Sequence, residues 1–334
     1  MIGYYVHHHG HGHRHRALAL AQALGRPVVG LSSAPAPRGW PGDWVLLPRD
    51  DEGGPPRDAT AQGRLHWVPV GDEGLAQRAA VVSQWIADAA PAAMVVDVSV
   101  EMTLLARLHG VRVVGVVQPG RRSDGPHLLG FDVSDALVGL WPSSSGDMLP
   151  GVPERVRERV VPLGALSRHP VAPERPRAPG PPRVTFLAGS GGPGLPEALL
   201  ASTRRQTPDW EWTVLGGAGT RTWSEDPRRA IEDADVVVTH AGQNALAEVA
   251  AARRPAVVVP EDRPFDEQLT TGAVLAEGWP AVVLPRLPRD GWPALLDRAR
   301  SLDGRGWGRW CDGRAAERFA GVVEDVASGQ RVGS

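Results

Sequence analysis

Hydrophobic residues recur along this chain in two alternating patterns, which together predict an α/β protein. Short apolar runs, typical of buried parallel strands, lead through small-residue turns into stretches with helical spacing. This order appears in both halves of the chain and predicts two Rossmann-like, doubly wound sheets. The strands expected in the first half are 2–6, 28–31, 44–47, 65–70, 93–98, 111–117, 136–140 and 159–163, with helices at 14–24, 72–90 and 101–109.

The pattern restarts in the second half after a proline-rich boundary. Six of the thirteen residues from Pro170 to Pro182 are proline, a composition that excludes a helix and indicates an extended linker. We therefore expect an N-terminal domain at 1–166, a linker at 167–183, a C-terminal domain at 184–305 and a last helix at 306–327. The strands expected here are 184–188, 212–215, 235–238, 255–259 and 281–284, with helices at 195–205, 227–233, 243–252, from 267, and at 291–301.

The amino-acid composition excludes several classes of reaction and of binding site. The 334 residues suffice for two domains, and all 36 basic residues are arginine, which excludes a lysine Schiff base and the lysine of a P-loop. The single cysteine, Cys311, excludes an intramolecular disulfide and a cysteine metal cage. A net charge of −2 gives no basic field for nucleic acid. No apolar run is long enough to span a membrane and no signal peptide is visible, so we expect a cytoplasmic protein with at most peripheral membrane association.

Residues 234–278 carry the strongest chemical pattern. A strand, a small-residue turn at 239–242, a helix, a second strand and a polar loop follow one another there. This order places a helix N-terminus at the carboxyl edge of a parallel sheet, which suits a phosphate group. The polar residues that gather near this edge are His240, Gln243, Asn244, Glu248, Asp266 and Gln268.

This stretch resembles the donor-sugar site of GT-B glycosyltransferases, and most of all glycosyltransferase family 28, the MurG-like enzymes. The likeness rests on the pattern THAGxNxxxE at 239–248 and on a later pair that ends in Gln268. It implies a GT-B fold in which a C-terminal helix crosses back to the first domain. It also implies that Gly242 and the helix start hold a diphosphate, that Glu248 binds the ribose hydroxyls, and that Asp266 or Glu267 with Gln268 binds the sugar. Helix capping by Asp266 is the structural alternative.

A histidine-rich turn opens the chain, with six histidines between His7 and His15. Alternating imidazoles could chelate zinc or nickel, or the run could be an accident that resembles an affinity tag. The spacing Gly10-x-Gly12-His13-x-x-Arg16 also resembles the first turn of family 28 transferases and of PseG-type nucleotide-sugar hydrolases. That likeness implies a donor contact at Gly12 and a general base at His13, because an imidazole of near-neutral pKa accepts a proton from a hydroxyl. We expect no metal and take the other histidines as structural or solvated.

Three further sets of residues are weaker candidates. Ser190 and Gly191 lie in a glycine turn that could contact phosphate or could be only a tight turn. Trp223 and Ser224 fall, by resemblance, beside the nucleotide base, although Trp223 could equally belong to the core. Acceptor contacts are expected from Asp97, Glu101 and Gln118, which follow strands of the first half; Asp97 and Glu101 could instead cap the next helix.

The predicted reaction is a metal-independent, inverting transfer of a hexose or N-acetylhexosamine. The donor would be a nucleotide-diphosphate sugar, UDP first, and no cofactor is expected. The chain departs from MurG-like enzymes, whose first turn reads GGTGGH where this chain has GHGH at 10–13, and no apolar membrane-contacting patch is evident. The acceptor, whether small molecule, glycan or lipid-linked, therefore stays open. A PseG-type hydrolase, a non-catalytic nucleotide-sugar-binding protein and a nucleotide-sugar 2-epimerase are the alternatives.

Overall fold

The computed structural model describes residues 1–8, 11–173, 180–189, 195–216 and 226–330. The chain divides into two compact units, which we describe separately. The first comprises Met1–Gly139, Pro150–Leu163 and the chain from Ala316 onward, and the second comprises Leu140–Leu149 and Gly164–Ala315. No helix among the described residues is both long and apolar enough to cross a membrane.

The first unit is built on a seven-stranded parallel sheet in the order β3-β2-β1-β4-β5-β6-β7. Ile2 of β1 lies opposite Val28 on one side and Ala93 on the other, so β1 is a central strand. Its residues are all buried, as the apolar run predicts. The strands are β1 Ile2–Tyr5, β2 Val28–Ser32, β3 Asp43–Leu46, β4 Ala93–Asp97, β5 Val113–Val117, β6 Ala136–Gly139 and β7 Val160–Pro162.

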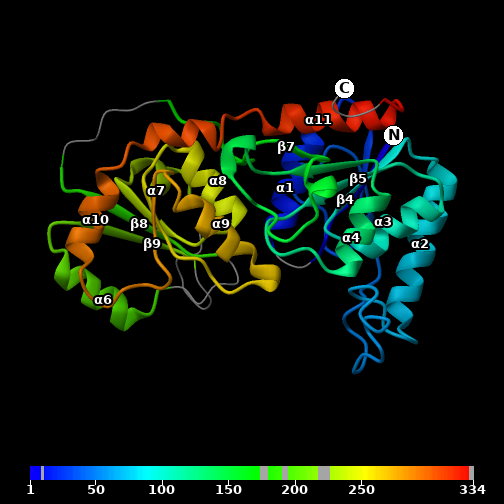
Figure 1. Ribbon diagram of the computed structural model, residues 1–334, viewed down its shortest axis with the longest axis horizontal. Helices are drawn as coiled ribbons and strands as arrows, with labels where there is room; N and C mark the ends of the chain where they lie inside the picture. The colour runs from blue at the N-terminus through cyan, green and yellow to red at the C-terminus, as the bar shows by residue number, and fades with distance from the viewer. Residues whose placement is uncertain (9–10, 174–179, 190–194, 217–225, 331–334) are drawn as a thin grey trace. The chain divides into compact units, whose positions relative to one another are not determined.

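Helices cover both faces of this sheet. The strand order reverses between β1 and β4, so right-handed crossovers place α1 on one face and the helices after β3, β4 and β5 on the other. Figure 1 shows α2, α3 and α4 lying side by side, and α2 and α3 contribute to one hydrophobic core with β1 and β4. The helices are α1 His11–Gln22, α2 Glu73–Ala89, α3 Val100–Leu108, α4 Gly125–Val133, α5 Glu154–Arg157 and α11 Ala315–Ala327.

The second unit contains a five-stranded parallel sheet in the order β12-β11-β10-β8-β9. Its order reverses between β8 and β10, which makes the carboxyl ends of these two strands its topological switch point. The strands are β8 Arg183–Leu187, β9 Glu211–Leu215, β10 Val236–Thr239, β11 Ala256–Val258 and β12 Ala281–Val283. The α-helices are α6 Glu197–Gln206, α7 Arg228–Asp233, α8 Gln243–Ala251, α9 Glu267–Leu275 and α10 Trp292–Arg300, and the 3₁₀ turns are η1 Ser143–Ser145, η2 Pro264–Asp266 and η3 Gly304–Arg309.

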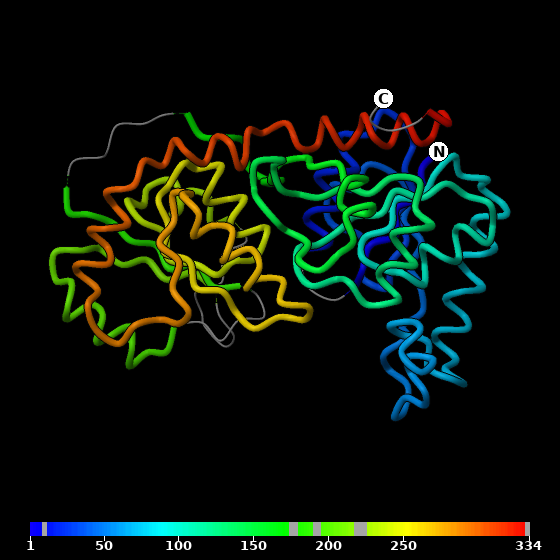
Figure 2. Tube along the Cα trace, in the orientation of Figure 1, coloured from blue at the N-terminus to red at the C-terminus, as the bar shows by residue number. Residues whose placement is uncertain are grey.

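Most predicted elements are present, and α2 begins after Asp72, which caps it by accepting a hydrogen bond from the Leu75 N–H. The strand predicted at 65–70 is wrong: the N–H groups of His66 and Trp67 donate to the Glu101 carboxylate instead of a strand partner. Figure 2 shows the irregular stretch 47–72 (blue to cyan) extending away from the sheet of the first unit.

Two helices differ from expectation. The single helix predicted at 306–327 is η3 followed by α11, and the chain between them passes through Gly313, whose φ of 83° breaks a helix. The helix α4 was not expected, because its glycine and proline start hides the helical pattern; Asp124 caps it, and proline is tolerated in a first turn.

Candidate functional site

The first candidate site lies at the switch point of the seven-stranded sheet, where His13 meets Asp97. His13 follows β1 in the first turn of α1, and Asp97 ends the neighbouring strand β4. The His13 Nδ1 atom lies 3.0 Å from Asp97 Oδ2, and Arg16, one helical turn after His13, donates from Nη2 to Asp97 Oδ1 at 2.6 Å. Burial by itself would raise the pKa of Asp97, but Arg16 and His13 lower it to about 2, so this buried carboxyl is ionised.

The backbone immediately after Asp97 is strained. Val98 has a φ of 70°, a left-handed conformation that is unfavourable for a β-branched residue. This turn is followed by Ser99, whose hydroxyl accepts from the Met102 N–H and caps α3. The cap expected of Asp97 or Glu101 is therefore supplied by Ser99. Asp97 has no exposed surface to offer an acceptor, and it contacts His13 and Arg16.

Two proton positions on His13 are compatible with its neighbours. The Nδ1 atom lies near both Asp97 Oδ2 and Arg16 Nη2, the latter at 2.8 Å. If Nδ1–H donates to Asp97, Nε2 keeps its lone pair; if Nδ1 accepts from Arg16, the proton lies on Nε2. Only the first arrangement leaves Nε2 able to take a proton from a substrate.

A cavity of about 200 Å³ lies beside this pair, within the first unit. The His7 ring is on its wall and lies 5.4 Å from the His13 ring, centroid to centroid. We call it the acidic cavity, because three carboxylates and one guanidinium line it. Its lining residues are Tyr5, His7, His8, Asp50, Asp51, Trp67, Leu75, Arg78, Ser99, Glu101 and Met102.

Glu101, predicted to contact an acceptor, does line the acidic cavity, and it also orders the opposite wall. Its Oε1 accepts from the N–H groups of His66 and Trp67 at 2.8 and 3.2 Å. The Trp67 indole N–H donates to the Asp50 carbonyl, which fixes the ring against the wall. The side chain of His8 is 6% exposed and lies 3.4 Å from Asp51, which agrees with a structural histidine and not with a solvated one.

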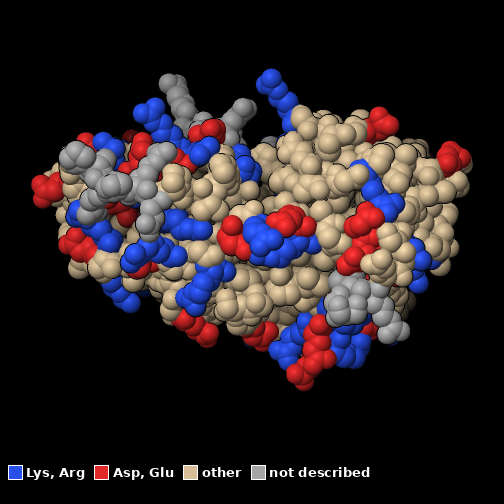
Figure 3. All heavy atoms as spheres, turned by 90° about the horizontal axis from the view of Figure 1, so that it is seen from above, with Lys and Arg blue, Asp and Glu red and all other residues tan. Residues whose placement is uncertain are grey.

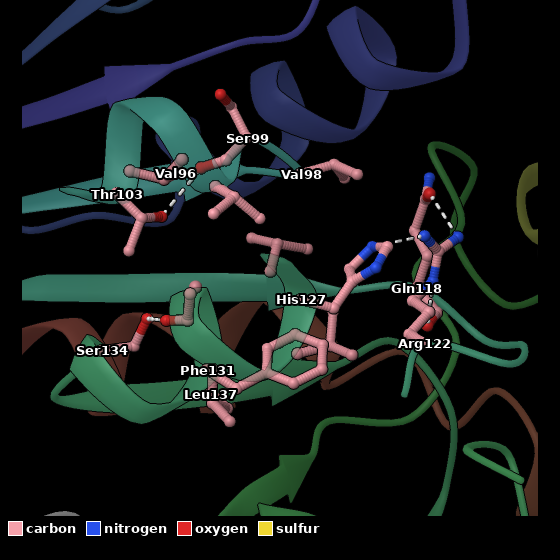
Figure 4. A pocket seen from close by; sticks show the side chains of 15 residues that line it. Val96, Val98, Ser99, Thr103, Gln118, Arg122, His127, Phe131, Ser134 and Leu137 are labelled. Atoms are coloured by element: carbon pink, nitrogen blue, oxygen red, sulfur yellow. Dashed lines mark hydrogen bonds between the residues drawn. The ribbon is translucent and has the colours of Figure 1, made fainter. Parts of the chain in front are cut away.

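Gln118, the third acceptor candidate, belongs to a second and smaller cavity of about 40 Å³. Figure 4 shows Gln118 and Arg122 at one end of this cavity, where Arg122 donates to Gln118 Oε1 and to His127 Nε2. Burial is the main cause that lowers the pKa of His127 to about 4, against the hydrogen bond from its Nδ1 to Asp124. The rest of the wall is mainly apolar, including Val96, Val98, Val100, Val116, Phe131 and Leu137. This space holds a water or a methyl group, which is too little for an acceptor.

Among the residues that the structure describes, two groups of side chains have the spacing of metal ligands, with ligand atoms within 4.8 Å of one another: His66, Asp124 and His127, and His8, Asp50 and Asp51. In the first, His127 Nε2 accepts from Arg122, so the ring proton lies on the Nδ1 that a metal would need. In the second, both carboxylates are already paired with arginines. Arg78 contacts Asp50 at 2.6 Å and Arg49 contacts Asp51 at 2.7 Å. Both sets of ligand atoms are therefore already engaged by protein groups, which disfavours a metal ion.

The second candidate site lies at the switch point of the five-stranded sheet, where His240 follows β10. Two glycines make room for its ring: a Cβ on Gly189, after β8, would come within 2.9 Å of Nε2, and one on Gly242 within 2.4 Å of Cε1. The Gly242 N–H donates to His240 Nδ1 at 3.0 Å, and burial lowers the pKa of this histidine. The neutral ring therefore carries its proton on Nε2, which is a hydrogen-bond donor.

Gln268 holds the two loops of this site together. Its side chain is 3% exposed, and Oε1 accepts from the N–H groups of Ala241 at 3.0 Å and Glu261 at 2.9 Å. These two hydrogen bonds occupy Oε1, so a sugar contact by Gln268, which stays a prediction, would fall to its amide nitrogen. The preceding turn is strained, since Phe265 and Asp266 both have left-handed φ values of 60° and 55°. Asp266 stands at the N-cap of α9 but makes no capping hydrogen bond, which contradicts the capping alternative.

Glu248, the predicted ribose ligand, lies on α8 and is 8% exposed. Burial is the main cause that raises its pKa, opposed by Arg168, whose Nε donates to Oε1 at 2.7 Å.

The remaining predicted donor residues lie at helix starts or outside the described residues. Gly242 forms the N-cap of α8, while Gln243 and Asn244 begin the helix and Glu267 begins α9. Gly12 lies in the first turn of α1. Ser190, Gly191, Trp223 and Ser224 lie outside the described residues.

Sequence reasoning missed several residues of these sites. The spacing of Arg16, three positions after His13 on a helix, could have indicated its contact with the same partner. Asp50 and Asp51 follow β3 at the carboxyl edge of the sheet, which also could have been read. Nothing local marks Arg78 or Arg168, whose partners lie 28 and 80 positions away.

Comparisons with known proteins agree with this architecture. Residues 219–277 match the glycosyltransferase family 28 C-terminal domain, a span that contains His240, Glu248 and Gln268. A search of curated proteins finds no match.

Solved structures with the same fold include MurG of Acinetobacter baumannii, with 16% identity, a TM-score of 0.65, and coverage of 97% of this chain and 99% of that one. The calicheamicin glycosyltransferase CalG4 has 17% identity, a TM-score of 0.65, and coverage of 100% and 99%. A UDP-glucosyltransferase from Polygonum tinctorium has 14% identity, a TM-score of 0.67, and coverage of 98% of each chain. This chain therefore has the GT-B fold of these glycosyltransferases, and its residues 219–277 match the glycosyltransferase family 28 C-terminal domain.

Proposed function

We propose that this protein transfers a hexose or N-acetylhexosamine from a nucleotide-diphosphate sugar to an acceptor hydroxyl, with UDP as the first candidate for the nucleotide. The observation that carries the proposal is the pairing of His13 with the buried, ionised Asp97 at the switch point of the first sheet. A carboxylate that accepts from Nδ1–H holds the ring in one tautomer and stabilises the imidazolium formed when Nε2 takes a proton.

The transfer step divides the roles between the two sites. His13 Nε2 removes the proton as the acceptor oxygen forms its bond to the anomeric carbon, and the bond from that carbon to the diphosphate breaks with its electron pair on the leaving phosphate. The negative charge is received by the His240 Nε2–H and by the N–H groups at the start of α8, which are preorganised donors. A single displacement of this kind inverts the anomeric configuration, and it requires no metal.

Donor recognition is assigned to the second site. Glu248 keeps Oε2 for the ribose hydroxyls while Arg168 holds Oε1, so the buried carboxylate is oriented before the donor arrives. Asp266 and Glu267, at the strained start of α9, contact the sugar, and Gln268 positions their loop against the turn at Ala241.

Calorimetric binding of UDP, GDP and dTDP to the full chain tests the donor site. We expect UDP to bind most tightly and Glu248→Ala to weaken it by about 10- to 100-fold, the value of a charge-assisted hydrogen bond. Glu197→Ala removes an exposed glutamate of the same unit on α6 and serves as the matched control. Equal binding by Glu248→Ala and Glu197→Ala would contradict the donor assignment.

The hydrolase alternative predicts a different product. A PseG-type enzyme releases free sugar from the donor when no acceptor is present, at a rate comparable with its transfer rate. A transferase releases it far more slowly, because water must replace the acceptor at His13. Measuring free sugar with and without acceptors therefore separates the two functions, and a binding protein turns over nothing in either assay.

A further inference from the structure

The acidic cavity indicates the chemical class of the acceptor, an inference that rests on the proposed transferase function. The cavity adjoins the base: His7 lines it and its ring lies 5.4 Å from that of His13. His13 itself does not line the cavity, so the proposal requires the acceptor to extend past His7 towards the base.

The lining carries an excess of negative charge. Asp50, Asp51 and Glu101 oppose Arg78 in the lining and Arg49 beside it, which pairs with Asp51 at 2.7 Å, so one negative charge remains with the histidines neutral. Carboxylates accept hydrogen bonds and donate none, so they select ligand groups that carry protons, such as hydroxyls and ammonium groups. Arg49 holds the pKa of Asp51 at about 2, so its charge persists throughout the physiological range.

Arg78 does not offset this preference, because its hydrogen bonds go to the protein. The side chain is 2% exposed. Nε donates to the Pro48 carbonyl at 3.2 Å, Nη1 donates to Asp50 at 2.6 Å and to the Tyr5 hydroxyl at 3.2 Å, and Nη2 contacts Ser33 and His8. A phosphate or carboxylate entering the cavity would meet three carboxylates and an arginine that is already coordinated.

The volume of the cavity and its apolar walls indicate the size and form of the ligand that fits it. A volume of about 200 Å³ accommodates one six-membered ring with its substituents, and Trp67, Leu75 and Met102 supply apolar surface for a ring face. A ring with one apolar face and a rim of proton-bearing groups is the form of a sugar or aminocyclitol. An ammonium group would also gain from the nearby indole.

We propose that the acceptor presents a cationic, hydroxyl-rich ring, such as an amino sugar or aminocyclitol, to the acidic cavity. The anionic head of a lipid-linked diphosphate is disfavoured there by charge. This departs from the acceptor expected of a MurG-like enzyme, and it follows from side chains that the family 28 domain does not contain, since all of them lie before residue 219.

Saturation-transfer NMR on the full chain tests the proposal with three ring sugars of similar size and different charge: glucosamine, glucose and glucuronate. At about pH 6.5 the amine is protonated and the uronate is ionised. We expect glucosamine to bind about tenfold more tightly than glucuronate, a difference of about 1.4 kcal/mol, with glucose between them.

Substitutions of residues that line the acidic cavity test whether the sugar binds there. Asp51→Asn should weaken glucosamine by about threefold to tenfold with little change for glucose, and Glu101→Gln, which retains an acceptor oxygen for His66 and Trp67, should do the same. The control Asp88→Asn makes the same chemical change on the exposed side of α2 in the same unit. Melting temperatures confirm that each variant is folded.

The inference is overturned if glucuronate binds as tightly as glucosamine, if glucosamine does not bind, or if both cavity variants behave as Asp88→Asn does. UDP calorimetry on the same samples keeps the two proposals apart. If UDP binds and the charge order is reversed, the acceptor class is wrong and the transferase proposal stands. If glucosamine binds as expected but no nucleotide does, the donor site is wrong.

Discussion

The Nδ1 atom of His13 lies 3.0 Å from Oδ2 of Asp97, although 84 positions separate the two residues in the chain. The contact exists because β1 and β4 are neighbours at the point where the sheet order reverses. Helices diverge to opposite faces there, which leaves the strand ends open to a ligand. The same reversal in the second sheet brings Gly189 beside His240.

The proton position on His13 is tested by Asp97→Asn. The amide cannot stabilise an imidazolium as a carboxylate does, so we expect kcat for transfer to fall by about 10²- to 10⁴-fold while UDP affinity stays unchanged. In a double-mutant cycle with His13→Ala, the two losses should be far from additive because the residues act as a unit. Additive losses would show that Asp97 contributes to transfer independently of His13.

Asp97 also makes the fold sensitive to acid. Its folded pKa of about 2 lies below the unfolded value of about 3.9, so the ionised group stabilises the fold above about pH 4. That contribution, on the order of 2 kcal/mol, is lost as the pH falls from about 4 to about 2. Denaturant titrations across this range should show a shallower pH dependence for Asp97→Asn than for the wild type or for Asp88→Asn. Parallel curves for all three proteins would contradict the assignment.

The strained turn at Val98 predicts an unusual tolerance of glycine. With φ at 70°, a β-branched residue costs about 1–2 kcal/mol there, which Val98→Gly recovers and which offsets the lost side-chain packing and added chain entropy. We expect Val98→Gly to change the free energy of unfolding by less than about 1 kcal/mol. The half-buried Val45 of β3 is the control, and Val45→Gly should cost about 2 kcal/mol. Similar losses at both positions would mean that the turn stores no strain.

Gln268 joins two loops by accepting hydrogen bonds from the Ala241 and Glu261 N–H groups, so its replacement should lower both the stability of the fold and the affinity for UDP. Gln268→Leu removes the oxygen that satisfies the N–H groups of Ala241 and Glu261, and two buried orphan donors cost about 2–4 kcal/mol. Chemical unfolding measures that loss, and calorimetry should show weaker UDP binding because the turn before α8 is no longer held. Gln84→Leu on the exposed side of α2 should change stability by less than about 0.5 kcal/mol. If Gln268→Leu is as stable as this control, Gln268 does not hold the two loops together.

Local sequence patterns predicted the fold class of this protein and most of its helices and strands. Buried strands are continuous apolar runs, and the turns between them and the helices use small residues, so the two parallel sheets and the order of 234–278 could be read directly. Family resemblance added the general glycosyltransferase assignment, which the domain match supports. These features depend on residues close together in the chain.

Only the tertiary structure decided which side chains meet. The pairing of His13 with Asp97, the inward direction of Gln268, and the acidic cavity assembled from the ends of β1, β3 and β4 all join segments that are distant in sequence. Side chains such as Asp50 and Arg78 look like ordinary surface charges in the sequence, because their burial depends on the order in which strands are placed in the sheet. That order is a property of the whole fold, and no local pattern encodes it.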